Sequence, residues 1–123
     1  MEIKEFDDLI NLGQIKRTVV LSGRKIDMHT LSSGEYAQMS HHVKSDPGTT
    51  QEQKFESLQR WTLAYSMDAI DSKPMSLDDK EKLLSLGQLA LSNLLYTEYL
   101  GMVDEQDKLI QDAKKNSSQP NLN

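Results

Sequence analysis

Three histidines are the side chains of this sequence best suited to acid–base or metal chemistry, and their spacing argues against both roles. His41 and His42 are adjacent, so on a helix their side chains point about 100° apart and cannot hold one metal ion. Positions 38 and 45 are Gln and Ser, so the i, i+4 spacing of a metal-binding helix is absent. His29 falls in a predicted strand with no acidic or histidine partner in reach along the sequence. We therefore expect solvated histidines and no metal or cofactor.

Other chemistry-bearing residues have simpler explanations. The acidic pairs Asp7-Asp8 and Asp78-Asp79 lie in the first turns of predicted helices, where the helix dipole favours carboxylates, and neither belongs to an Asp-x-Asp-x-Asp-Gly loop. Ser32-Ser33-Gly34 lacks the Gly-x-Ser-x-Gly pattern of a nucleophile, and the glycines are too scattered for a phosphate-binding loop. The sequence predicts a protein that is not an enzyme.

Length and composition favour one helical domain. The chain has 123 residues, 14 Lys plus Arg against 19 Asp plus Glu, a net charge of −5, six Met and no Cys. Without a basic patch, nucleic acid is not an expected partner, and no apolar run reaches the ~18 residues of a membrane span. We predict a single α+β domain over residues 1–114 and a polar, irregular tail over 115–123.

The first third of the chain predicts a short helix and a β-hairpin. Apolar residues at helical spacing over 3–12 end at Gly13, which suits a left-handed turn after a helix. Residues 16–21 and 24–31 alternate apolar and polar side chains around Ser22-Gly23, the pattern of a hairpin.

The remainder predicts a compact arrangement of four helices. Ser32 and Glu35 form a capping box, with Leu31 and Tyr36 as a hydrophobic staple, for a helix whose inner face carries Tyr36, Met39 and Val43. Thr49 or Thr50 can cap a helix expected over residues 51–70. Further helical sequence is expected from 77 to about 114, broken near Gly87 and continuous through Gly101. The expected core residues are Trp61, Leu63, Tyr65, Ile70, Leu84, Leu91, Leu94 and Leu95.

With no catalytic group in view, the remaining candidates are surfaces. A hairpin edge can add a strand to or from a neighbour, and the Leu- and Met-rich C-terminal half exceeds what one small core needs. We predict that the chain binds partners through the hairpin and the last helix, at Val19, Leu21, Ile26, Met28, Tyr99, Met102 and Val103.

The order of motifs resembles a known group of proteins. The hairpin over 18–26, the phrase His29-Thr30-Leu31-Ser32-Ser33-Gly34-Glu35-Tyr36, and a helix closing with Leu63-Ala64-Tyr65-Ser66-Met67-Asp68-Ala69-Ile70-Asp71 before Pro74 are similar to bacteriophage tail morphogenesis proteins. This group comprises tail assembly chaperones and small tail or baseplate-associated subunits. The likeness spans roughly residues 9–103.

The resemblance implies a non-catalytic role in building a phage tail. Expected partners are the tape-measure, tube or baseplate proteins, with self-association as a further option. The expected location is the host cytoplasm during assembly. A transient chaperone and a subunit retained in the virion tail both stay open. The alternative outside this group is a small cytosolic adaptor or regulator that binds a partner by helix-in-groove contacts.

Overall fold

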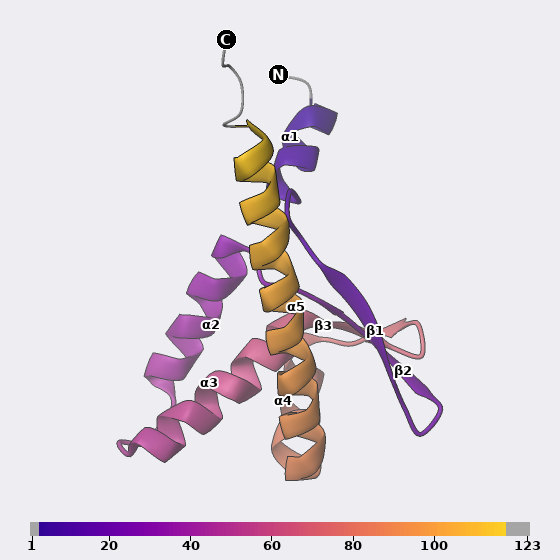
Figure 1. The fold of residues 1–123 in the computed structure, drawn as a ribbon. Helices are drawn as coiled ribbons and strands as arrows, with labels where there is room; N and C mark the ends of the chain where they lie inside the picture. Colours follow the sequence, from indigo (N-terminus) through magenta and orange to yellow (C-terminus); the bar gives the residue numbers. More distant parts are fainter. Residues whose placement is uncertain (1–2, 118–123) are drawn as a thin grey trace.

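The computed structural model describes residues 3–117, which form five helices and a four-stranded antiparallel sheet (Figure 1). The elements follow one another as α1 Ile3–Ile10, β1 Lys16–Leu21, β2 Arg24–His29, α2 Ser33–Ser45, α3 Gln51–Ser66, β3 Met67–Ile70, β4 Lys73–Pro74, α4 Leu77–Leu86 and α5 Leu89–Ser117. The predicted mostly helical α+β fold is confirmed. The predicted tail boundary at residue 115 falls inside α5, and residues 118–123 lie outside the described residues.

The arrangement places the sheet and two helices on opposite sides of α5. Figure 1 shows the β-hairpin projecting to one side, α2 and α3 forming a V on the other, and α1 beside the far end of α5. None of the described helices has the length and apolar character that would let it cross a membrane.

The predicted hairpin is present, with β1 paired antiparallel to β2 from Lys16–His29 to Leu21–Arg24. Ser22 and Gly23 both have positive φ, 49° and 77°. This is the backbone of a two-residue turn whose twist matches the twist of the strands. Gly13 also takes a left-handed φ of 85°, as expected after α1.

The hairpin is not isolated, because β2 pairs on its other side with β3. The predicted helix through Ile70 is therefore wrong beyond Ser66: Met67 leaves helical geometry while its N–H still bonds the Leu63 carbonyl. The sequence pattern did not separate helix from strand here, because the strand exists only through its hydrogen bonds to β2. Asp71 reinforces this pairing by accepting from the Lys25 N–H at 2.9 Å.

Helix starts agree with the predicted capping chemistry. Ser32 and Glu35 form a capping box, and so do Thr50 and Gln53. Gly87 separates α4 from α5, and α5 passes through Gly101 as expected. Tyr36 is an exception: it is 58% exposed, so its predicted place on the inner face of α2 is wrong, although Met39 is buried.

The core lies between one face of the sheet and helices α3, α4 and α5. Among the predicted core residues, Leu63, Leu84 and Leu95 are buried, Trp61, Ile70 and Leu91 pack at its margin, and Tyr65 is half-buried. Leu94 is 42% exposed, so its assignment to the core is wrong. The inner face of α5 follows Leu91, Leu95, Tyr99 and Met102, at intervals of four, four and three residues. Leu94 lies about 100° from Leu95 around the helix and misses that face.

Adjacent leucines of α5 provide a direct stability test. Leu95→Ala should lower the free energy of unfolding by about 2–5 kcal/mol, because Leu95 is 1% exposed and its truncation leaves a cavity. Leu94→Ala should cost less than about 1 kcal/mol. Urea unfolding followed by circular dichroism measures both, and a larger loss for Leu94→Ala would contradict the orientation of α5.

Candidate functional site

Most of the predicted partner-binding residues lie in the core. Five of them are less than a tenth exposed: Val19 (7%), Ile26 (5%), Met28 (1%), Tyr99 (8%) and Met102 (0%). Leu21 and Val103 are partly buried against the same cluster. These residues hold the sheet to α5 in the folded chain, and their role in binding a partner stays a prediction.

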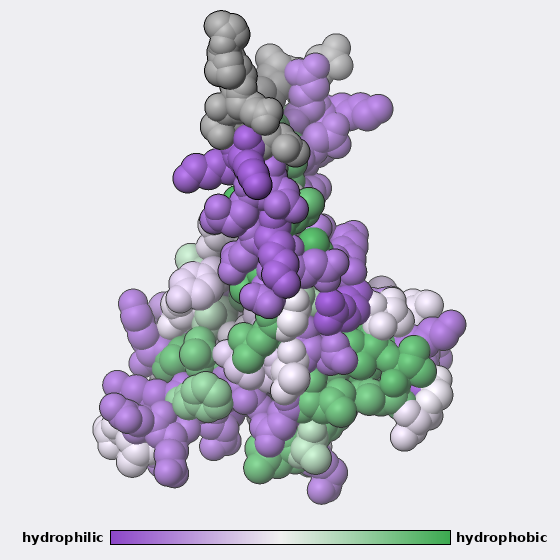
Figure 2. Space-filling view, in the orientation of Figure 1, coloured by the Kyte–Doolittle hydropathy of each residue, from purple (hydrophilic) through white to green (hydrophobic). Residues whose placement is uncertain are grey.

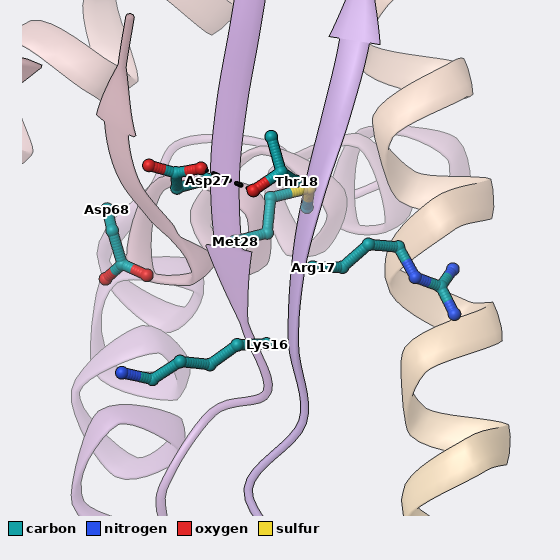
Figure 3. A pocket seen from close by; sticks show the side chains of 6 residues that line it. All are labelled: Lys16, Arg17, Thr18, Asp27, Met28 and Asp68. Atoms are coloured by element: carbon teal, nitrogen blue, oxygen red, sulfur yellow. Dashed lines mark hydrogen bonds between the residues drawn. The ribbon is translucent and has the colours of Figure 1, made fainter. Parts of the chain in front are cut away.

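The predicted free edge of the hairpin is reduced to β1. β2 cannot accept a further strand, since β1 and β3 occupy both of its sides. From β1, Arg17 reaches α5 and pairs with Glu98 at 3.0 Å and with Glu105 at 2.9 Å. Figure 3 shows Arg17 directed toward this helix and Lys16 directed away from it. Edge-to-edge pairing through the hairpin is thus restricted to β1, which α5 already flanks at Arg17.

His29 is the residue whose surroundings differ most from the expectation. Its Nε2 atom lies 2.9 Å from Glu35 Oε2, and its Nδ1 atom lies 2.8 Å from Asp68 Oδ1. The side chain is only 10% exposed, so the predicted solvated histidine without acidic partners is wrong. Glu35 comes from α2 and Asp68 from β3, which folds back onto β2 across a separation of 39 positions in the chain.

Two charged groups near His29, the carboxylate of Glu35 and the ammonium of Lys80, have lowered pKa values. Burial alone would raise the pKa of Glu35, but the Ser32 N–H and the His29 ring outweigh it and hold that pKa below its ordinary value of 4.5. Lys80 on α4 donates to the Met67 carbonyl at 2.7 Å, and burial lowers the pKa of its ammonium group, opposed by the charges of Asp68 and Glu35. These residues connect β2, α2, β3 and α4 in one ionic cluster.

The cluster is arranged for attachment and not for turnover. Both ring nitrogens of His29 face a carboxylate oxygen, Nε2 that of Glu35 and Nδ1 that of Asp68. With both nitrogens engaged, His29 has no free nitrogen to offer a substrate. Across the part of the chain that the structure describes, no three or more His, Cys, Asp or Glu side chains are placed to hold a metal ion.

A shallow hollow of about 380 Å³ lies next to Asp68 (Figure 3). It is lined by Lys16, Arg17, Thr18, Asp27, Met28 and Asp68. Thr18 donates to Asp27 at 2.7 Å, as the dashed line in the figure shows. The lining mixes both signs of charge and is open to solvent, so it lacks the convergent polar groups of a ligand site.

The other candidate side chains also have structural roles. His42 stacks on Trp61 with ring centroids 3.9 Å apart and bonds the Tyr65 hydroxyl, so it is packed and partly buried, whereas His41 is exposed. Asp46 Oδ2 accepts from Trp61 at 2.9 Å and from Arg60 at 2.7 Å. Burial raises the pKa of Asp46, but the hydrogen bonds from Ser57, Trp61 and Arg60 outweigh it and hold that pKa below its usual value. This second cluster joins the end of α2 to α3.

Exposed apolar surface remains at both ends of α5. Figure 2 shows apolar atoms at the lower end, near the α4–α5 turn, and a strip between the hydrophilic surfaces of α5 and α1. At the turn, Leu86 and Leu89 are 77% and 69% exposed. At the other end is a groove of about 450 Å³, which we call the arm groove, lined by Leu12, Gly13, Leu109, Ile110, Ala113 and Lys114. No local pattern in the sequence predicts this groove, because it forms between segments nearly a hundred residues apart.

The fold resembles that of a phage tail assembly protein of known structure. It is similar to the solved tail assembly chaperone of bacteriophage HK97, with a TM-score of 0.53 and 15% sequence identity, over 81% of this chain and 98% of that one. No protein-family model and no curated protein matches the sequence. The likeness in fold agrees with the predicted group of tail assembly proteins, and the similar structure within that group is a chaperone.

The charge on Glu35 can be tested separately from its capping role. Glu35→Gln keeps an acceptor for the Ser32 N–H but removes the charge that faces His29. Because folding lowers the pKa of Glu35, its stabilisation is complete above the ordinary value of 4.5 and is lost as pH falls through the lower folded value. We expect the variant to lose about 1–3 kcal/mol of unfolding free energy near neutral pH. In urea titrations, this loss should shrink as the pH drops below 4.5.

The matched control is Glu105→Gln, which removes a carboxylate paired with Arg17 but 57% exposed. Its loss should stay below about 1 kcal/mol. Equal losses for the two variants, or a Glu35→Gln loss that does not change with pH, would contradict the ionic cluster.

Proposed function

We propose that this chain is a phage tail assembly chaperone that binds the tape-measure protein in the host cytoplasm and leaves before the tail is complete. The observation that supports this role is the fold, which is similar to nearly the whole length of the HK97 tail assembly chaperone. The proposal narrows the group implied by the sequence, in which a retained tail or baseplate subunit was the other option.

The distribution of surface residues supports the same role. A chaperone needs apolar surface for its client, yet it must remain dispersed when it is free. The exposed leucines of α5 provide apolar surface, and a net charge of −5 opposes association of the free chains. Arg17 of β1 pairs with Glu98 and Glu105 of α5, so the exposed leucines of α5 are carried on a helix that is attached to the sheet.

Inactivating the gene in the phage or prophage that encodes it tests the role. We expect lysates without normal tails, restored by supplying the chain in trans, because the client would aggregate or fail to assemble. In infected cells that carry a tagged chain, the tape-measure protein should be captured with it. Virions purified from the same lysate should lack the chain, while the tail-tube protein serves as the positive control on the same blot.

Two results would contradict the proposal. Normal tails in the absence of the gene would exclude a role in tail assembly. The chain present in washed virions at a fixed ratio to the tube protein would identify it as a retained subunit.

A further inference from the structure

One end of the molecule is an arm that carries more apolar surface than its two segments cover. The arm consists of residues 3–13, which include α1, and residues 104–117 at the end of α5, which lie side by side in Figure 1. Its large apolar side chains are about half exposed: Phe6 (57%), Leu9 (54%), Ile10 (57%), Leu12 (73%), Leu109 (48%) and Ile110 (44%). The arm groove therefore lies on a surface that the rest of the described chain leaves open to a partner.

The groove is formed before any partner arrives. Gln106 Nε2 donates to the Gly13 carbonyl and to Thr30 Oγ1, both at 3.1 Å, which attaches the turn after α1 to α5 and to the sheet. At Gly13, a Cβ atom would come within 2.9 Å of Ile110 Cδ1, and φ is +85°. Only glycine meets both conditions without strain. A preformed groove loses little conformational entropy on binding.

The shape of the groove favours a helix as its occupant. Its walls are α5 and the turn that follows α1, and a helix can place its side-chain ridge along α5 beside that turn. Leu109, Ile110 and Ala113 offer apolar positions at helical spacing, the usual counterpart of an amphipathic helix. The arm segments described here contain no strand, so they offer no sheet edge for an extended peptide.

The net charge of the arm favours another protein over a second copy of this chain as the occupant of the groove. The arm carries four cationic residues and seven acidic ones, a net charge of −3 out of −5 for the chain. They are Lys4, Lys108, Lys114 and Lys115 against Glu5, Asp7, Asp8, Asp104, Glu105, Asp107 and Asp112. A second copy of the arm would bring the same negative charge, which opposes its approach. A helix with cationic flanks would be attracted.

We propose that the arm groove binds an amphipathic helix of another protein, with Leu- or Ile-type residues on the buried face and Lys or Arg along its flanks. The identity of that protein as a tail component rests on the proposed function. The binding chemistry does not, because it follows from the apolar lining and the acidic surroundings of the arm.

Synthetic peptides test this chemistry on the full chain. One peptide of about 18 residues has a leucine face and lysine flanks, and a second has the same leucine face with glutamate flanks. Fluorescence anisotropy should show the lysine peptide binding at least about tenfold more tightly, with an advantage that falls as salt is added. In amide NMR spectra of the unmodified chain, the lysine peptide should shift signals from residues 6–13 and 104–115.

Paired variants separate the groove from general apolar surface. Leu109→Gln with Ile110→Gln should weaken binding of the lysine peptide at least about tenfold. Leu94→Gln with Leu100→Gln changes two leucines of the same helix that are 42% and 51% exposed and lie outside the arm, and it should leave the affinity unchanged. Thermal melting of both double variants, compared with that of the unmodified chain, shows whether folding is intact. If one variant unfolds, the NMR map on the unmodified chain decides the site.

Three outcomes would overturn the inference. Equal binding of both peptides would exclude the charge preference, and NMR shifts confined to the α4–α5 turn would exclude the site. Dimerisation of the free chain in sedimentation that Leu109→Gln with Ile110→Gln abolishes would make a second copy the occupant. Each outcome is independent of tail assembly in infected cells, so failure here is distinguishable from failure of the proposed function.

Discussion

The pairing of β2 with strands on both of its sides is the constraint on which the rest of the structure depends. Buried backbone N–H and C=O groups must find partners, and β2 finds them in β1 through a two-residue turn and in β3 after two intervening helices. The second pairing ends α3 at Ser66 and returns the chain to the hairpin. It also brings Asp68 to the histidine that Glu35 contacts from the other side.

The His29 cluster is a consequence of that pairing and in turn secures α2. Each ring nitrogen of His29 lies within contact of a carboxylate oxygen, at 2.9 Å and 2.8 Å, so its burial leaves neither nitrogen without a partner. The same Glu35 caps α2 through the Ser32 N–H, so one carboxylate serves the helix start and the contact between helix and sheet. An arrangement that resembles acid–base machinery is thereby explained as a structural attachment.

The partly exposed ends of α5 distinguish this chain from a domain that buries all of its large apolar residues. The middle of the helix supplies the core through Leu95, Tyr99 and Met102, while Leu86 and Leu89 near its start and Leu109 and Ile110 near its end stay accessible. A central helix held by the core can present apolar surface without losing its position.

The sequence by itself determined the local elements: the hairpin turn at Ser22-Gly23, the capping boxes at Ser32 and Thr50, and the break at Gly87. Each depends on residues within a few positions of one another. Only the tertiary structure decided that Met67–Ile70 is a strand, that Leu95 and not Leu94 faces the core, and that Asp68 meets His29. It also decided that Gly13 and Ile110 border one groove. These outcomes depend on hydrogen bonds and packing between residues far apart in the chain, which local propensity and periodicity do not encode.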